Sequence, residues 1–246
     1  MMFDINLNVL FSKTQEYLYK KYSLLHHVEF LEGKTVWILS PHPDDDAIGC
    51  GGTIIKHIQM GHFVHIVYLC SGDKGISGEV TNKTIKIRHK EAQDAALIMG
   101  VSTDKIYFLD IPDETLRSNI DIASVKLKNL FNSFPPDLLY LPSFLDRHND
   151  HIATNDILKK CDLKNTIISA FEVWTPIIPN RIVDISTSVN QKQKAINAHF
   201  SQLKALEYDK AILGLNQYRA KMYTKKDMEY AEAFLALKWE EYITLY

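Results

Sequence analysis

Residues 36–52 read VWILSPHPDDDAIGCGG, and this stretch decides the fold. Its first four residues are apolar, with the length and type typical of a buried strand. Its last residues are small and lead into Ile54 and Ile55, which indicates the start of a helix. Between the two stand His42 and three consecutive carboxylates at 44–46. Burying unpaired charge is costly, so such groups are paired, metal-bound or placed at a solvent cleft. Open α/β sheets bind ligands at strand ends of this kind, which makes the stretch a candidate site.

The rest of the chain continues the alternation of strand and helix that begins there. We predict strands at about 35–39, 63–69, 105–109, 138–141, 166–173 and 181–185. We predict helices at about 46–60, 82–99, 120–131 and 153–160, with most of 189–237 also helical. This alternation is typical of βαβ units and a parallel sheet. The fold class we expect is α/β, a Rossmann-like three-layer α/β/α arrangement with a mostly parallel sheet and C-terminal helices.

Residues 1–33 precede the first predicted strand. Apolar residues recur there at roughly helical spacing, which predicts a helical N-terminal extension. A membrane-surface helix is the less favoured alternative, because few basic residues line its polar face. No linker follows, so we expect residues 34–246 to form one domain that carries this extension.

Charge and cysteine content narrow the class of protein. The net charge is −2, from 28 basic and 30 acidic residues, whereas nucleic-acid binding usually shows as a basic excess. The three cysteines, Cys50, Cys70 and Cys161, have no metal-ligand spacing and suggest no disulfide framework, which favours a reducing compartment. We recognise neither a signal peptide nor an apolar run long enough to span a bilayer. We therefore expect a cytoplasmic protein with no nucleic-acid partner.

A second cluster of polar residues, DRHNDH at 146–151, follows the predicted strand at 138–141. In a parallel sheet the carboxyl ends of the strands lie at one edge, and the first and fourth strands are neighbours in the common orders. This arrangement would bring His148 and His151 towards His42 and Asp45. Two imidazoles and one carboxylate are a standard catalytic zinc set that leaves a position open for water.

These two motifs together resemble one known family. PHPDD at 41–45, a following Gly-Gly pair, and H-x-D-H at 148–151 are similar to the N-acetylglucosaminylphosphatidylinositol de-N-acetylases, also called the PIG-L or LmbE-like deacetylases. Further blocks at 88–92, 172–176 and 230–234 resemble that family, the last of them its closing helix.

The resemblance implies a metal site and a base. His42, Asp45 and His151 would be the metal ligands, with Zn²⁺ the expected ion and another divalent metal such as Fe²⁺ an alternative. Asp44 would be the general base. Adjacent side chains in a turn diverge, so Asp44 would stand beside the metal while Asp45 binds it.

The resemblance also implies supporting residues. His148 would be the acid or oxyanion stabiliser, oriented by Asp150. Arg88 and Arg181 are weaker candidates for supporting the site or contacting the substrate. The second motif of the family usually has proline where this chain has Asn149, and that change affects the turn that aims His148.

The expected function is a zinc-dependent hydrolase that removes the N-acetyl group from an N-acetylated amino sugar of the GlcNAc type by metal-activated water. Its partner would be a small-molecule amino-sugar conjugate, and self-association is left open. A non-haem Fe(II) oxygenase uses the same two-histidine, one-carboxylate set, but its usual β-barrel is not predicted. A non-catalytic sugar-binding relative is the other alternative, which intact Asp44 and His148 argue against.

Overall fold

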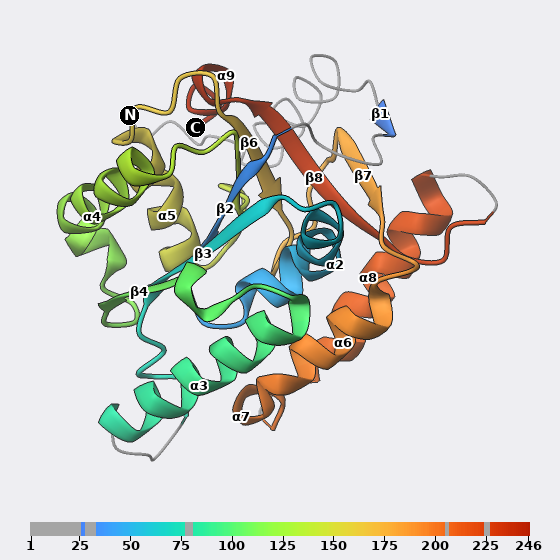
Figure 1. Ribbon diagram of the computed structural model, residues 1–246, viewed down its shortest axis with the longest axis horizontal. Helices are drawn as coiled ribbons and strands as arrows, with labels where there is room; N and C mark the ends of the chain where they lie inside the picture. The colour runs from blue at the N-terminus through green and yellow to red at the C-terminus, as the bar shows by residue number, and fades with distance from the viewer. Residues whose placement is uncertain (1–25, 28–32, 77–80, 205–206, 224–226) are drawn as a thin grey trace, which may run out of the picture.

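The computed structural model describes residues 26–27, 33–76, 81–204, 207–223 and 227–246. They form one eight-stranded sheet covered by helices on both faces (Figure 1). Every strand pairing is parallel except the two made by β8. In sheet order the strands are β1 (His26–His27), β7 (Arg181–Asp184), β8 (Ala231–Lys238), β6 (Ile167–Phe171), β5 (Leu138–Pro142), β2 (Thr35–Ser40), β3 (Phe63–Cys70) and β4 (Ile106–Ile111).

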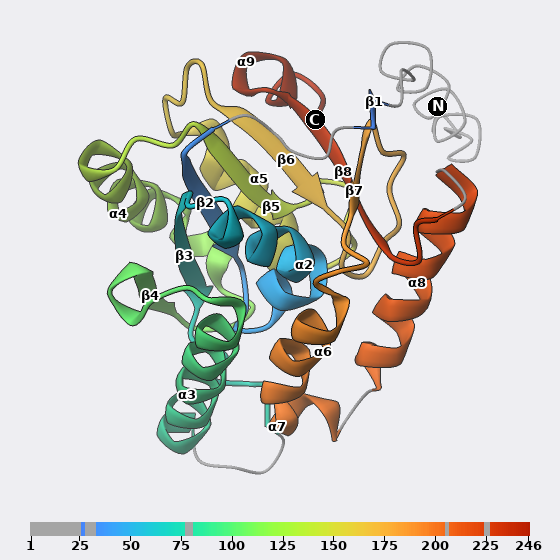
Figure 2. The same ribbon diagram turned by 45° about the vertical axis from the view of Figure 1, so that its right-hand side comes forward.

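The helices divide between the two faces, which gives the predicted three layers (Figure 2). Alternate residues of β2 point to opposite faces, so Val36 and Ile38 enter one core and Trp37 and Leu39 the other. The first core is covered by α2 (Asp45–Gln59), α3 (Thr81–Met99), α6 (Val189–Ala198) and α8 (Tyr208–Tyr223). The second is covered by α4 (Ile120–Ser133), α5 (Asn149–Lys159) and α9 (Trp239–Tyr242). The short helix α7 (Phe200–Leu203) and the 3-10 turns Thr103–Lys105 and Leu116–Asn119 complete the described elements.

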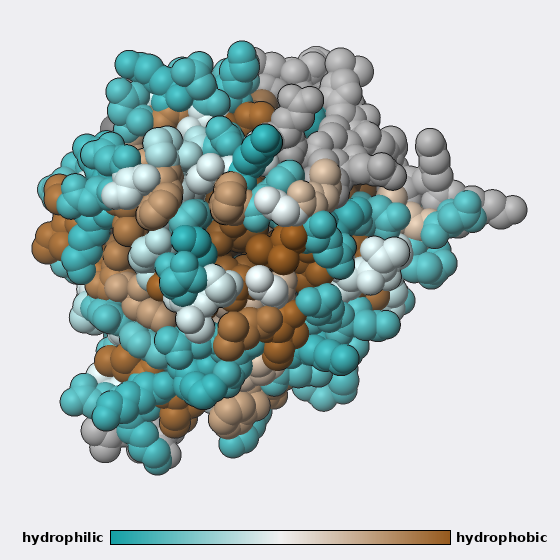
Figure 3. All heavy atoms as spheres, viewed as in Figure 1, coloured by the Kyte–Doolittle hydropathy of each residue, from teal (hydrophilic) through white to brown (hydrophobic). Residues whose placement is uncertain are grey.

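On the face shown in Figure 3, hydrophilic side chains make up most of the rim and hydrophobic ones gather towards the middle. Within the described ranges, no helix is long and apolar enough to cross a bilayer. All three cysteines are buried and free.

The predicted α/β class and parallel sheet are confirmed, but two elements differ from the sequence-based expectation. Residues 231–238, expected to be helical, form the strand β8, which lies between β6 and β7 and is buried on both faces. Its alanines and glutamate have little strand preference of their own, so the two neighbouring strands decide its conformation. The predicted N-terminal helix falls on residues 1–25, which lie outside the described residues, while His26–His27 pair with β7 as a short strand.

The strand β8 also anchors a kink in α2. Cys50 interrupts α2 with a non-helical φ of −142°, so a second helical segment begins after it. The Glu232 carboxylate accepts hydrogen bonds from the backbone amides of Gly52 (2.9 Å) and Thr53 (2.8 Å) at the start of this segment. Lys192 Nζ lies 2.6 Å from the same carboxylate, and both side chains are fully buried. The ion pair therefore satisfies helix amides that would otherwise be orphaned in the core.

We expect Glu232→Gln to lower the free energy of unfolding by roughly 3–5 kcal/mol, because it leaves the Lys192 ammonium buried without its counter-charge. Chemical denaturation followed by circular dichroism measures this change. Asp94→Asn is the matched control, since it breaks the exposed ion pair with Lys90 on α3 and should cost less than about 1 kcal/mol. Equal losses in the two variants would contradict the role given to Glu232.

A buried histidine makes stability depend on pH. His57 Nε2 lies 2.9 Å from the Tyr140 hydroxyl and its Nδ1 lies 2.8 Å from Nδ1 of His62. Burial, with a smaller effect of His62, lowers the pKa of His57 to about 3. The folded state thus favours neutral His57, and its contribution is complete above the unfolded pKa near 6.5 and is lost as pH falls towards 3.

At pH 4.5, two units below the unfolded pKa, the loss from His57 should be about 2.7 kcal/mol. We expect His57→Gln, which cannot titrate, to reduce the difference in unfolding free energy between pH 7.5 and pH 4.5 by about that amount. Urea titrations at the two pH values measure this difference. An unchanged difference would show that His57 is protonated in the folded state.

Candidate metal centre and active site

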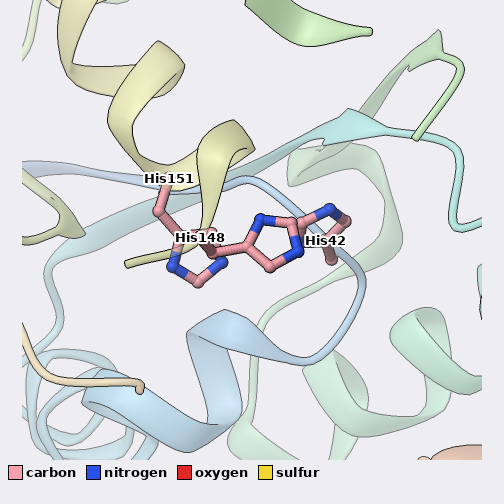
Figure 4. A group of neighbouring side chains, drawn as sticks. All are labelled: His42, His148 and His151. Carbon is pink, nitrogen blue, oxygen red and sulfur yellow. The ribbon is translucent and has the colours of Figure 1, made fainter. Parts of the chain in front are cut away.

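The sheet brings the two polar motifs together as predicted. Strands β2 and β5 are parallel neighbours, with Ile38 opposite Tyr140 in the register. Their carboxyl ends therefore lie at the same edge. The segment after β2 carries His42, and the turn after β5 carries His148 and leads into His151 on α5. Figure 4 shows the three imidazoles grouped at this edge.

Two of these imidazoles meet at one carboxylate oxygen. Asp45 Oδ2 lies 3.3 Å from His42 Nδ1 and 3.2 Å from His151 Nε2. His151 is fully buried, and neither of its ring nitrogens has a partner with hydrogen-bond geometry. Two imidazole nitrogens and a carboxylate that converge in this way are a donor set suited to Zn²⁺. The residues predicted as ligands therefore fit a divalent metal.

Each of the two imidazoles has a second carboxylate on its far side. His42 Nε2 lies 3.2 Å from Asp150 Oδ2, and His151 Nδ1 lies 3.4 Å from Asp146 Oδ1. Metal-binding histidines commonly donate their other N–H to a carboxylate, which fixes the tautomer and aims the free nitrogen at the metal. Here the arrangement leaves His42 Nδ1 and His151 Nε2 as the nitrogens available to an ion.

The Asp150 carboxylate lies next to His42. It contacts the imidazole and accepts hydrogen bonds from the backbone amides of Glu114 (2.8 Å) and Leu116 (3.3 Å). Asp150 thus holds His42 through its carboxylate. It meets His148 through its backbone amide, which donates to His148 Nδ1 (3.2 Å), and orientation of His148 by the Asp150 carboxylate stays a prediction. Sequence reasoning also missed Asp146 as the partner of His151, although its position five residues before that histidine was visible.

Protonated imidazoles balance the negative charge of the carboxylates at the site, and a bound cation would take over this role. Burial opposes ionisation of Asp45, yet His151 and His42 outweigh it and hold the pKa of Asp45 well below its usual value. Burial likewise opposes the charged form of His151, but Asp45 and Asp146 raise its pKa to about 9. Protons on the imidazoles thus neutralise the carboxylates, and a divalent ion would displace them on binding.

His148 is held differently from the other two histidines. It caps the N-terminus of α5, where its Nδ1 accepts a hydrogen bond from the Asp150 backbone amide (3.2 Å). Its ring centroid lies 4.7 Å from that of His42 and 4.8 Å from that of His151. Half-burial and the neighbouring positive histidines lower the pKa of His148. A neutral ring whose Nδ1 accepts must carry its proton on Nε2, which makes it a hydrogen-bond donor.

Ligand atoms of His42, His148 and His151 lie within 4.8 Å of one another, as do those of His42, Cys70 and Asp113. The first group replaces Asp45 with His148 and is an alternative ligand set. The Asp45 carboxylate faces two of these histidines and supplies the negative charge that three neutral imidazoles lack. We therefore prefer the set that contains Asp45.

Asp44 stands next to this cluster in an unusual backbone conformation. Its φ of 148° is one that L-residues rarely adopt, and it lies at the junction between β2 and α2. Arg88 Nη2 lies 3.3 Å from Asp44 Oδ2 and donates to the Pro43 carbonyl, so the guanidinium braces this turn. Burial raises the pKa of Asp44 to about 6, more than Arg88 lowers it. A carboxylate with a pKa in this range is suited to accept a proton near neutral pH.

The two arginines predicted as supporting residues lie in different places. Arg88 lines the pocket and contacts Asp44. Arg181 does not line it, because it begins β7 at the amino edge of the parallel strands, opposite the edge that carries the site. Its guanidinium donates to the carbonyl of Asn180. Arg181 is thus not among the described residues that line the pocket, and its role as a substrate contact stays a prediction.

The cluster lies at the wall of a pocket of about 640 Å³. Besides the polar residues above, the pocket is lined by a set of mostly apolar side chains that sequence reasoning did not find, among them Ile48, Val173, Trp174, Tyr208, Ile212 and Leu215. A pocket of this size with a few converging polar groups is typical of a small-molecule site.

Comparison with known proteins agrees with this geometry. The family model described as PIG-L, GlcNAc-PI de-N-acetylase, matches residues 37–161, about half of the chain, and spans both polar motifs. The chain belongs to the PIG-L family. This confirms the resemblance seen in the sequence, and the chain is accordingly an enzyme.

The relatives of this PIG-L protein include enzymes named for different reactions. A diacetylchitobiose deacetylase of Thermococcus kodakarensis is 29% identical over 196 residues, which are 70% of this chain and 72% of the relative. A 4-oxalmesaconate hydratase of Pseudomonas putida is 32% identical over 126 residues, 48% of this chain and 47% of the hydratase. The match thus spans about half the length of that relative.

A solved structure extends the likeness over nearly the whole chain. The N,N'-diacetylchitobiose deacetylase of Pyrococcus horikoshii aligns with a TM-score of 0.73 at 24% identity, covering 98% of this chain and 96% of the deacetylase. At this identity the comparison shows that this PIG-L protein has the fold of that enzyme.

Proposed function

We propose that the protein removes the N-acetyl group from an N-acetylated amino sugar or its conjugate, using a zinc ion held by His42, Asp45 and His151. The observation that carries the proposal is that His42 Nδ1 and His151 Nε2 both face one oxygen of Asp45, which lines a pocket beside Asp44. The names of two relatives, both diacetylchitobiose deacetylases, support the substrate class.

Each residue at the site would have a separate role in amide hydrolysis. A bound zinc ion would act as a Lewis acid on the amide carbonyl and generate the nucleophile from water. Asp44 would accept a proton from the attacking water, since its carboxylate lies beside the three donors and is not one of them. His148 donates its Nε2 proton to the carbonyl oxygen or to the leaving amine. Arg88 holds Asp44 in place and keeps it ionised enough to act as a base.

Acetate release from purified protein loaded with Zn²⁺ tests the proposal directly. The substrates are N-acetylglucosamine, diacetylchitobiose and simple alkyl glycosides of N-acetylglucosamine, with the matching non-acetylated sugars as blanks. Acetate and a new primary amine should appear in equal amounts, and chelation should abolish both. The proposal would be refuted if zinc-containing protein released neither acetate nor amine from any of these N-acetylated sugars. Loading with Fe²⁺ in parallel identifies the better metal.

A hydratase is a second candidate, because one relative is a 4-oxalmesaconate hydratase. Water addition to a carbon–carbon double bond could use the same metal and base. Loss of the ultraviolet absorbance of 4-oxalmesaconate, without acetate release from sugars, would favour this function. The iron oxygenase and the non-catalytic sugar-binding protein have no such support from the relatives. Three further predictions from the sequence remain predictions. They are the cytoplasmic location, self-association, and the division into residues 1–33 and 34–246.

A further inference from the structure

One wall of the pocket comes from a single face of α8. The four residues of this helix that line the pocket are Tyr208, Ala211, Ile212 and Leu215. Their spacing of i, i+3, i+4 and i+7 places them in one stripe along the helix. The stripe runs for two turns, about 10 Å. The stripe packs against the first core, where Ile212 is buried, and it also borders the pocket.

The opposite wall is apolar as well. Ile48 from α2 and Val173, Trp174 and Pro176 from the segment after β6 line the pocket. The Trp174 side chain is 42% exposed although it is one of the largest apolar groups in the chain. Apolar side chains on two sides of a pocket favour binding of an apolar group, because binding removes apolar surface of both the group and the pocket from water.

The polar groups gather at one end of the α8 stripe. The Tyr208 hydroxyl is buried without a hydrogen-bond partner, and so are Nε and Nη1 of Arg88. Arg88 contacts Asp44, so this end is the catalytic one. Leu215, two turns further along, marks the other end. Polar side chains of the pocket therefore lie at the Tyr208 end, near Asp44, and apolar ones lie further along the helix.

Away from the metal ligands, the charges of the pocket disfavour an acidic group as its occupant. Apart from His42, which faces Asp45, two cationic side chains stand among the described lining residues. Lys74 faces Glu114 and Arg88 faces Asp44. The same lining carries five carboxylates in all, Asp44, Asp45, Asp113, Glu114 and Glu207. A phosphate or carboxylate on the substrate would find no free cation among these residues and would meet like charge.

We propose that the α8 stripe and the wall opposite it form a subsite for an uncharged apolar substituent, alkyl or aryl, carried by the amino-sugar substrate. This inference rests on the proposed function for the identity of the sugar. The apolar substituent can be attached at two positions on the sugar. It is either the group on the glycosidic carbon or a longer N-acyl chain. The experiment treats the two separately.

Two substrate series measure the effect. The first is N-acetylglucosamine carrying methyl, butyl, hexyl or octyl at the glycosidic carbon, and the second is methyl glucosaminide with N-acyl chains of two to eight carbons. Each methylene that becomes buried should raise kcat/KM roughly fourfold, so one series should rise by about tenfold or more. The rising series identifies the position of the chain. N-acetylglucosamine 1-phosphate should be poorer than the methyl glycoside. Flat profiles in both series, or a preference for the phosphate, would overturn the inference.

Variants on one helix separate the subsite from general effects. Leu215→Asp should bring the octyl-to-methyl ratio of kcat/KM, or the corresponding ratio in the acyl series, down towards 1. Met222→Asp makes the same kind of change on the same helix, at an exposed residue outside the pocket lining, and should leave the ratio as it is. An unchanged ratio in Leu215→Asp would place the chain elsewhere.

A binding measurement separates this inference from the proposed function. Octyl glucoside has the apolar chain but no N-acetyl group, and calorimetry below its micelle concentration measures its affinity without any reaction. Binding that is weakened by Leu215→Asp but not by Met222→Asp supports the subsite even if no acetate is ever released. No detectable binding, together with acetate release that ignores chain length, refutes the subsite and leaves the deacetylase intact.

Discussion

Replacing Asp44 with asparagine should lower kcat for acetate release by roughly 10²–10⁴-fold, because the variant keeps the shape of the side chain but cannot accept the proton of the attacking water. Asp44 is the carboxylate that stands beside the metal-binding cluster, is braced by Arg88 and has a pKa raised by burial to about 6. KM should change much less than kcat, since the sugar-binding walls are untouched. Steady-state kinetics with a metal-loaded variant measures both constants.

The neighbouring carboxylate supplies the matched control. Asp46 is fully buried and accepts a hydrogen bond from the Tyr68 hydroxyl (2.9 Å), and it does not line the pocket. Burial raises the pKa of Asp46 to about 7, so the neutral asparagine in Asp46→Asn costs little. We expect that variant to keep kcat within about threefold, well below the effect of removing a general base. If Asp44→Asn retained kcat within tenfold while binding metal normally, Asp44 would not be the base.

The part of the fold that positions the site could be predicted from the sequence because its signals are local. Apolar runs at 36–39 and 138–141 are followed at once by ionisable side chains, and such groups have no reason to follow a buried strand unless they line a site. The parallel arrangement then requires the two clusters to meet. The observed pairing of β2 with β5 bears this out.

What the sequence could not supply depends on contacts between distant segments. Strand β8 consists mainly of alanine, leucine and glutamate, residues that suit a helix, and it is extended because β6 and β7 pair with it on both sides. The spacing of His148 and Asp150 showed that they are close but not which imidazole the carboxylate holds. That choice is made by the start of α5, which turns Asp150 towards His42 and the amides of Glu114 and Leu116.

Removing one metal ligand should abolish both metal and activity, and this distinguishes the two possible ligand sets. We expect Asp45→Asn and His151→Ala to purify with far less than one zinc per chain and to release no acetate above the metal-free protein. Neither change leaves a complete set of two imidazoles and one carboxylate. Elemental analysis of the dialysed proteins and the acetate assay measure the two effects.

His148→Ala is the decisive comparison, because His148 shares the neighbourhood of His42 and His151 yet is assigned a different task. Its Nδ1 is occupied by the backbone amide that it caps, and its Nε2 is the donor that the reaction needs. The variant should therefore keep its zinc and lose roughly 10²–10⁴-fold in kcat, the usual cost of removing a general acid. If His148→Ala lost the metal and Asp45→Asn kept it, the three histidines would be the ligands. Asp45 would then only hold two of them in place, as Asp146 and Asp150 do from the other side.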